Sequence, residues 1–330
     1  MNLWKFRDMA IAGGVSLSLL VLSGCGGSAT TSSSPKDEKT KDEHKATDAK
    51  PSKDEKPSSS KKEALKPGKA VVKGTVKFEG DEPDLAKLNA ALVELVKEKA
   101  APDKDHCLAP SAPETDKEQQ AWRINKTNKG LKNVVVFLVP EQGTYFANSA
   151  DDDAVKAVKD KSLDIHQPFC EFHPHTAVLF PKFRDEKNKE QITGQTVTVF
   201  NDTDKSGGKA GGVAHNTKWS GGSGQSEGNA TIPPGGKKPI DDLIPQRSPV
   251  TFQCSIHPWM NATVWVLDNP YFAVTDEDGN FEIKNAPVGN VRIVVWHEAA
   301  AGNYLNSGEG KGETIELKDG ENKKDFTAKK

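Results

Sequence analysis

The sequence predicts an all-β protein that consists of two β-sandwiches and one short helical insertion. Its apolar segments are short and rich in β-branched residues, and turn residues separate them. Strands and helices do not alternate along the chain, which argues against a parallel sheet with crossover helices. After a polar N-terminal region, roughly 260 residues remain, which suffices for two domains of ordinary size.

The N-terminus predicts an exported protein. Lys5 and Arg7 precede an apolar stretch at residues 9–22. This stretch suits the hydrophobic region of a signal peptide and is too short to span a bilayer stably.

Residues 22–25 read Leu-Ser-Gly-Cys and resemble the lipobox of bacterial lipoproteins. The resemblance implies a signal peptide at residues 1–25 that ends in a lipidated Cys25. It also implies a membrane anchor in the cell envelope, facing the periplasm, and Gly26 in place of Asp favours the outer membrane. An ordinary signal peptide with a chance cysteine is the alternative.

Residues 26–69 are predicted to form a disordered tether. Hydrophobic residues make up only 35% of the chain, and large apolar side chains are almost absent from this segment. Such a segment cannot bury enough apolar surface to offset the entropy lost on ordering. The net charge of -2 gives no indication of a nucleic-acid partner.

The folded part is predicted to begin with a strand at residues 70–78, where β-branched residues alternate with others. Apolar residues recur at helical spacing from Leu85 to Val96 and predict the only clear helix, which Pro102 ends. Residues 131–139 are typical of a buried strand. Later strands are expected at residues 195–200, 250–253, 262–267, 271–275, 281–284 and 291–296.

One loop carries the clearest chemical signal. Residues 254–260 read Cys-Ser-Ile-His-Pro-Trp-Met and lie between two predicted strands. They offer a thiolate, an imidazole and a thioether, which hard cations do not prefer. Two imidazoles, a thiolate and a weak axial thioether define a type 1 (blue) copper site, and His215 is the upstream candidate for the second imidazole. Zinc also accepts Cys and His, but Met is a poor zinc ligand.

The Cys-x-x-His-x-x-Met loop, together with the earlier His-Asn pair, resembles the cupredoxins and most of all their amicyanin-like members. The resemblance covers residues 176–267. It implies a Greek-key β-sandwich with one type 1 copper site. The implied ligands are His215, Cys254, His257 and Met260.

Neighbours of these ligands have expected roles. Asn216 and Ser255 are expected to hydrogen-bond between the two ligand-bearing loops and tie them together. Pro258 and Trp259 are expected to stiffen the loop and to surround an exposed edge of His257 with apolar surface, where a partner protein would dock.

Two cysteines remain after Cys25 and Cys254 are assigned, namely Cys107 and Cys170. An exported protein folds in an oxidising compartment, so a disulfide between them is the default expectation. The sequence alone does not show that the two residues are close.

Further histidines surround Cys170. His166, His173 and His175 could form a second metal site, but their spacing matches no tetrahedral zinc motif, and Cys170 has a disulfide partner available. His106 and His297 have no assigned role.

The tail of the chain carries a second resemblance. Residues 271–283, followed by Pro-Val-Gly at 287–289, resemble the carboxypeptidase regulatory-like, prealbumin-type β-sandwich. In that family a Gly-x-Val strand and an apolar strand come first, and residues 74–76 and 133–138 supply both. The resemblance implies a domain split into residues 70–162 and 271–330, with a cupredoxin domain inserted at 163–270. Two consecutive domains are the alternative.

These expectations converge on a lipid-anchored, one-electron carrier of the cell envelope that binds copper and meets a redox partner protein. Copper storage or delivery by the same site is the first alternative, and an interaction lipoprotein with a vestigial metal loop is the second. An enzyme is not expected, because four protein ligands leave the metal no open position for a substrate.

Overall fold

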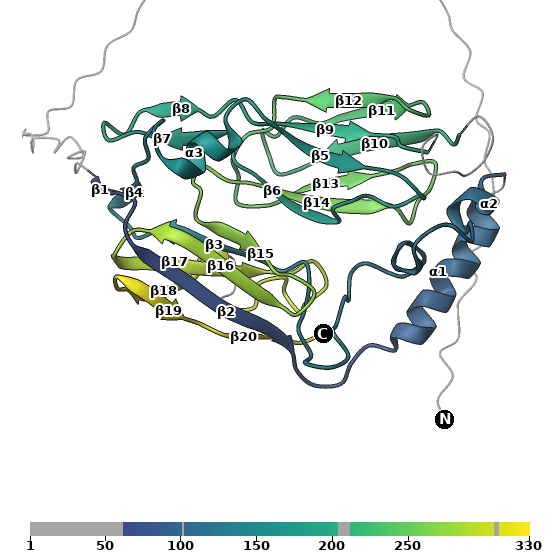
Figure 1. Cartoon of the computed structure of the whole chain (residues 1–330), viewed down its shortest axis with the longest axis horizontal. Helices are drawn as coiled ribbons and strands as arrows, with labels where there is room; N and C mark the ends of the chain where they lie inside the picture. Colours follow the sequence, from purple (N-terminus) through teal and green to yellow (C-terminus); the bar gives the residue numbers. More distant parts are fainter. Residues whose placement is uncertain (1–61, 101, 204–211, 307–309) are drawn as a thin grey trace, which may run out of the picture. The chain divides into compact units, whose positions relative to one another are not determined.

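Strands form most of the regular secondary structure in the described residues and helices are few, so the all-β class predicted from the sequence is confirmed (Figure 1). The computed structural model describes residues 62–100, 102–203, 212–306 and 310–330. The predicted signal peptide, the lipidated Cys25 and most of the predicted tether lie outside these residues. No helix in the described ranges is long and apolar enough to cross a membrane.

One sandwich, called the inserted sandwich below, carries the predicted copper ligands. Its two sheets have the strand orders β11-β10-β13-β14-β6 and β12-β9-β5. Alternate side chains of its strands, such as Val197 and Val199 of β9 or Val264 and Val266 of β14, point into one buried core. The strands are β5 (Ser162–His166), β6 (Thr176–Leu179), β9 (Thr196–Phe200), β10 (His215–Ser220), β11 (Gly228–Ile232), β12 (Lys237–Ile240), β13 (Val250–Gln253) and β14 (Asn261–Val266).

The other sandwich, called the flanking sandwich, is assembled from chain on both sides of the inserted one. In one sheet β2 pairs with β16, β19 and β20, and in the other β3 pairs with β15 and β17 while β18 extends β17. The chain therefore begins this sandwich, leaves it, and returns to complete it. The strands are β2 (Ala70–Phe78), β3 (Val135–Pro140), β15 (Phe272–Val274), β16 (Asn280–Ala286), β17 (Gly289–Trp296), β18 (Glu313–Leu317), β19 (Gly320–Lys323) and β20 (Phe326–Ala328).

The folded chain starts earlier than predicted. Strand β1 (Glu63–Leu65) lies within the segment expected to be a tether, and it pairs in parallel with β4 (Thr144–Phe146). Leu65 packs against the core of the flanking sandwich, which explains why these residues are ordered. The tether prediction was therefore wrong for this short segment.

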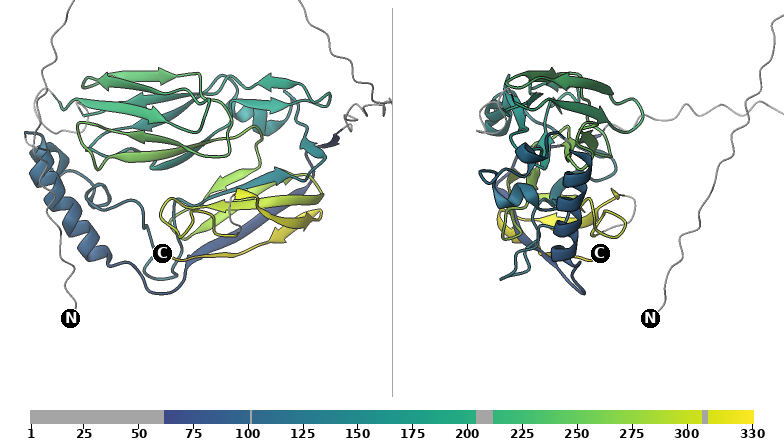
Figure 2. Two further views of the ribbon diagram at one scale, coloured as in Figure 1. Left: turned by 180° about the vertical axis from the view of Figure 1, so that it is seen from behind. Right: turned by 90° about the vertical axis from the view of Figure 1, so that its right-hand side faces the viewer.

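Helix α1 (Leu85–Lys99) begins at Asp84, whose carboxylate accepts a hydrogen bond of 3.0 Å from the backbone N–H of Lys87. Its first residue packs against the flanking sandwich, whereas Val96 and Ala100 at its end belong to the core of the inserted sandwich. Figures 1 and 2 show the helix running beside both sandwiches. The remaining short elements are α2 (Lys104–Cys107), a 3-10 turn at Glu114–Lys117, α3 (Asp153–Val158), β7 (Lys182–Arg184) and β8 (Glu190–Ile192).

The two sandwiches share a buried aromatic cluster. Trp265 of β14 is fully buried, and its ring centroid lies 4.9 Å from that of Phe137 and 5.6 Å from that of Trp296, both in the flanking sandwich. Since aromatic side chains contribute large buried areas, this contact couples the stabilities of the two sandwiches.

Candidate metal centre

The strand register brings the candidate ligands to one end of the inserted sandwich. His215 is the first residue of β10, Cys254 directly follows β13, and Met260 directly precedes β14. β10 and β13 are antiparallel, and Lys218 faces Gln253. The start of β10 therefore lies beside the residues that follow β13.

Backbone hydrogen bonds close the loop between β13 and β14. The N–H of Cys254 donates to the carbonyl of Met260 at 3.1 Å, and the N–H of Met260 donates to the carbonyl of His257 at 2.9 Å. The loop is thus a compact turn at the end of a hairpin, closed by its own backbone hydrogen bonds.

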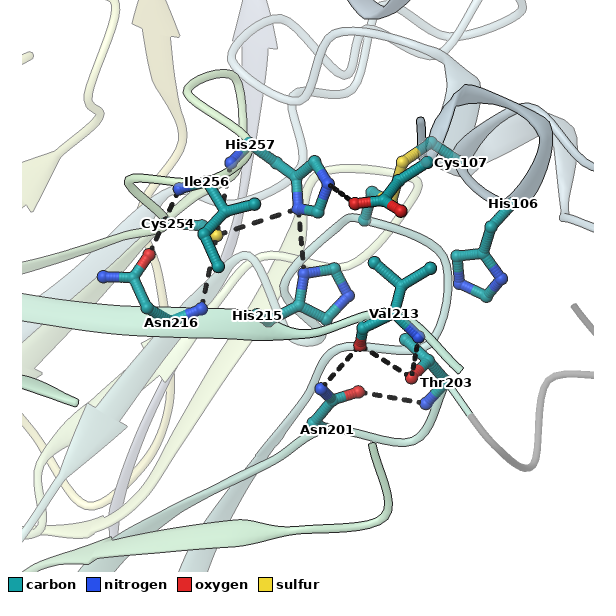
Figure 3. A network of polar contacts seen from close by, with 12 residues as sticks. His106, Cys107, Asn201, Thr203, Val213, His215, Asn216, Cys254, Ile256 and His257 are labelled. Carbon is teal, nitrogen blue, oxygen red and sulfur yellow. Dashed lines mark hydrogen bonds and ion pairs between the residues drawn. A yellow bond between two sulfur atoms is a disulfide. The ribbon is translucent and has the colours of Figure 1, made fainter. Parts of the chain in front are cut away.

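Three donor atoms converge inside this turn. Nδ1 of His215 lies 3.0 Å from Nδ1 of His257, and Sγ of Cys254 lies 3.8 Å from Nδ1 of His257 (Figure 3). All three atoms lie within 4.8 Å of one another, and all three residues are buried. A buried cluster of two imidazoles and a thiol is the donor set of a soft or borderline metal ion.

The protonation states suit metal binding. Burial, together with the neighbouring His257 and His106, lowers the pKa of His215 to about 3, and burial also lowers the pKa of His257. Both imidazoles are therefore neutral near pH 7 and have a lone pair to offer. Burial raises the pKa of the Cys254 thiol, so binding of a metal there would release a proton.

Asn216 joins the two ligand-bearing segments, as the sequence suggests. Its side-chain Oδ1 accepts hydrogen bonds from the backbone N–H groups of Ser255 and Ile256, and its Nδ2 donates to Oγ of Ser255 at 3.4 Å. Its backbone N–H points at Sγ of Cys254, 3.5 Å away, and the N–H of His257 does the same at 3.4 Å. These donors would stabilise a thiolate at this position.

Met260 is fully buried in the same apolar core as Cys254. Its place on the loop is the one predicted for an axial ligand.

The expectation that His257 lies at the surface was wrong, because its side chain is fully buried. Residues Asp103–Cys107, called the capping segment below, cover it: Oδ2 of Asp103 lies 3.4 Å from Nε2 of His257. Figure 3 shows His257 between Cys254 on one side and Cys107 on the other. The sequence could not reveal this cover, because the capping segment is distant in the chain.

The exposed part of the ligand loop consists of other residues. Ser255, Ile256 and Pro258 are exposed, and Ile256 has 40% of its surface accessible. Trp259 is half-buried: its ring lies 5.3 Å from that of His257, and its Nε1 donates to the carbonyl of Cys170 at 3.1 Å.

Cys107 and Cys170, the pair expected to be linked, form a disulfide with Cα atoms 5.2 Å apart. Their sulfur atoms and a ring nitrogen of His257 lie within 4.8 Å of one another. The disulfide therefore attaches the capping segment directly beside the candidate metal centre.

The other histidines have separate acidic partners. His166 lies 2.6 Å from Asp202, His173 lies 3.0 Å from Asp116, and His175 lies 2.5 Å from Glu298. Among the described residues, the groups of three converging donors both contain His257, so these histidines join neither. His297 is buried and packs against Trp122, with ring centroids 5.1 Å apart.

Sequence reasoning missed two residues of the site. No role was predicted for Asp103 or His106. His106 is buried, and its Nε2 lies 3.0 Å from the carbonyl oxygen of Pro168. The position of these two residues beside Cys107 predicts only that they lie near Cys170, and the sequence does not show that Cys170 lies beside His257.

Comparisons with known proteins add little to this picture. No protein-family model matches the chain, and no curated protein does. A copper-containing nitrite reductase from Thermus scotoductus SA-01 is 15% identical over 33% of this chain and 23% of its own, with a TM-score of 0.25. A purple cupredoxin from Nitrosopumilus maritimus is 17% identical over 31% of this chain and 97% of its own, with a TM-score of 0.22. The donor atoms of His215, Cys254 and His257 are themselves the feature that indicates a metal centre.

Proposed function

We propose that this chain is a type 1 copper protein that carries single electrons. The observation that supports this most directly is the buried convergence of Nδ1 of His215, Sγ of Cys254 and Nδ1 of His257. Met260 would be the weak axial ligand. This donor set suits both cuprous and cupric ions, and the chemistry that copper would supply is a reversible one-electron couple.

The surroundings of the donors suit such a couple. His215 is held by a strand, Cys254 and Met260 by the closed loop, and Asn216 ties the two segments together. Groups fixed in this way move little when the charge at the centre changes, and burial excludes water from them. Rapid electron transfer needs both properties.

An enzymatic role is not part of the proposal. His215, Cys254, His257 and Met260 would together occupy four positions around the metal, whereas catalytic metal sites keep a position open for substrate or water. We also propose that Cys25 is lipidated, that the protein faces the periplasm from the outer membrane, and that its partner is a redox protein of the envelope.

The burial of His257 favours a second candidate function, storage or delivery of copper. A carrier that exchanges electrons through an exposed ligand edge would leave His257 accessible, but the capping segment covers it. A covered site would release its metal slowly, which suits storage, and delivery would require an acceptor that displaces the capping segment.

A visible absorption spectrum distinguishes the candidates. Residues 26–330, purified without metal and given one equivalent of Cu(II), should develop an intense visible band and show a reversible one-electron potential if the chain is an electron carrier. A colourless site that passes Cu(I) to an acceptor would instead support delivery. If copper does not bind at all, both candidates fall.

A further inference from the structure

We propose that Asp103 is a positioning residue that orients His257 and lowers the reduction potential of the copper centre. This inference rests on the proposed function, because the potential is that of the bound copper. On this proposal the capping segment covers His257 on the side away from His215 and Cys254, and it supplies a carboxylate that the ligand loop lacks.

The geometry places the carboxylate on the far side of the ligand ring. Nδ1 of His257 faces His215 and Cys254, whereas Nε2 of the same ring lies 3.4 Å from Oδ2 of Asp103. When Nδ1 binds a metal, the ring proton must reside on Nε2, and the carboxylate of Asp103 attracts it electrostatically across the 3.4 Å contact, which does not have the geometry of a hydrogen bond. A carboxylate beside the outer nitrogen of a metal-binding imidazole makes the ring a more basic ligand and favours one ring orientation.

Burial strengthens the interaction. The side chain of His257 is 1% exposed and that of Asp103 is 18% exposed, so the contact between the carboxylate and the ring is largely shielded from solvent. Electrostatic interactions are stronger in such surroundings than at the surface. The cupric centre has one more positive charge than the cuprous centre, so the carboxylate stabilises the cupric form more and lowers the potential.

The carboxylate is held in place by the segment that carries it. The carbonyl of Asp103 accepts hydrogen bonds from the N–H groups of His106 at 2.9 Å and of Cys107 at 3.0 Å. The side chain makes no capping hydrogen bond to α2. Cys107 is in turn linked to Cys170, whose carbonyl accepts the hydrogen bond from Trp259 of the ligand loop. The disulfide thus fixes Asp103 relative to the loop that it acts on.

The test compares two substitutions that remove the same charge. Asp103→Asn keeps the size of the side chain but removes its charge beside His257, whereas Asp105→Asn removes an exposed charge two residues away. We expect Asp103→Asn to reduce the preference for the cupric state about tenfold, an upward shift of about 59 mV for a one-electron couple. Asp105→Asn should shift the potential much less, and both variants should keep the visible band.

A metal-free measurement gives an independent readout. In the apo chain, the imidazole nitrogen shifts of His257 should show the proton on Nε2, and Asp103→Asn should weaken this bias while Asp105→Asn leaves it unchanged. Asp103→Glu retains the charge and should keep the potential nearer to that of the unchanged protein than Asp103→Asn does. This variant also covers the case in which Asp103→Asn does not fold.

The outcomes separate this inference from the proposed function. If the unchanged chain has a reversible copper couple and Asp103→Asn shifts it no more than Asp105→Asn, only the role of Asp103 is overturned. If the unchanged chain has no copper couple, the proposed function fails and the effect on the potential falls with it. The tautomer of His257 in the apo chain then decides whether Asp103 positions the ring.

Discussion

At the scale of single residues, the proposed ligands differ in how strongly each would hold copper. The thiolate of Cys254 would supply the donor orbital for a charge-transfer band, and the backbone N–H groups of Asn216 and His257 already point at its sulfur. The thioether of Met260 would bond weakly along the axis. Loss of the two sulfur ligands should therefore have distinct consequences.

We expect Cys254→Ser to abolish the visible band, because oxygen does not replace the thiolate as donor. Met260→Leu should leave the colour largely intact and raise the reduction potential. Removal of an axial donor takes more stabilisation from the cupric state than from the cuprous state. Absorption spectra and voltammetry of the two copper-loaded variants check this. Equal bleaching by both substitutions would show that Met260 is not a weak axial ligand.

The sequence predicted which residues converge but not what surrounds them. Spacing within residues 254–260 keeps Cys254, His257 and Met260 on one short turn, whereas His215 was predicted from the resemblance to cupredoxins, and strand pairing brings it beside Cys254 and His257. The burial of His257 and the role of Asp103 depend on a contact between distant parts of the chain. No periodicity or composition reports such a contact.

At the scale of elements, the disulfide holds the capping segment against the inserted sandwich. Val96 is the buried residue of α1, and Leu92 and Leu108 are only partly buried against the core of the inserted sandwich. The Cys107–Cys170 bond joins positions 63 residues apart in sequence and attaches α2 to the inserted sandwich. A cross-link of this kind stabilises mainly by restricting the unfolded chain.

We expect replacement of Cys107 and Cys170 by Ser to reduce the free energy of unfolding by about 2–4 kcal/mol. Denaturant unfolding of the double variant measures this change, and peptide mass spectrometry of the unreduced protein should recover the two cysteines as one linked species. The idea fails if alkylation of the native chain labels both of them in addition to Cys254.

A buried ion pair joins His175, directly before β6, to Glu298, which follows β17. Burial alone would lower the pKa of His175, but the carboxylates of Glu171 and Glu298 outweigh this and raise it to about 9. Because this value exceeds the ordinary 6.5, protonated His175 stabilises the fold fully below pH 6.5, and the contribution is lost as the pH rises through about 9. His175 also holds the pKa of Glu298 below its ordinary value against the effect of burial.

His175→Gln should therefore destabilise the protein by about 1.5–3 kcal/mol at pH 6. The difference from the unchanged protein should shrink steadily between pH 6.5 and 9, as urea unfolding at a series of pH values would show. His166→Gln is the control: the His166 side chain is 46% exposed, so its pair with Asp202 should contribute about 1 kcal/mol or less. A pH-independent loss in His175→Gln would contradict the assignment.

Prediction of the elements succeeded where hydrophobic alternation was clear. In β16, Phe281 and Ile283 are buried and their neighbours are exposed, as expected for a strand with one face in the core. β12 was missed because it is an edge strand of sequence Lys-Lys-Pro-Ile, and Pro239 is tolerated only at such an edge. β8 was missed because all of its residues are exposed.

At the scale of the whole molecule, the pairing of β2 and β3 with later strands makes the flanking sandwich depend on residues from both ends of the folded chain. The inserted sandwich supplies Trp265 to the cluster that the two share. Neither sandwich buries this cluster alone, so we expect the two to unfold together in a single thermal transition.

Trp265→Ala should separate the two sandwiches. Loss of a buried aromatic side chain costs about 3–5 kcal/mol, and here the loss falls on contacts with Phe137 and Trp296. Calorimetry should then show two unfolding transitions. Cu(II) should raise the transition temperature of the inserted sandwich only, because a ligand stabilises the unit that binds it. In the unchanged protein, Cu(II) should raise the temperature of the single transition.

Trp122→Ala is the matched control. Trp122 belongs to the core of the flanking sandwich, where its ring lies 5.4 Å from that of Phe78, and it takes no part in the shared cluster. Trp122→Ala should lower the transition temperature about as much as Trp265→Ala does. The transition should stay single, and Cu(II) should still raise its temperature. If Trp265→Ala also gives one transition that copper raises as a whole, the shared cluster is not what couples the sandwiches, and the coupling must come from the chain connections and the His175 ion pair.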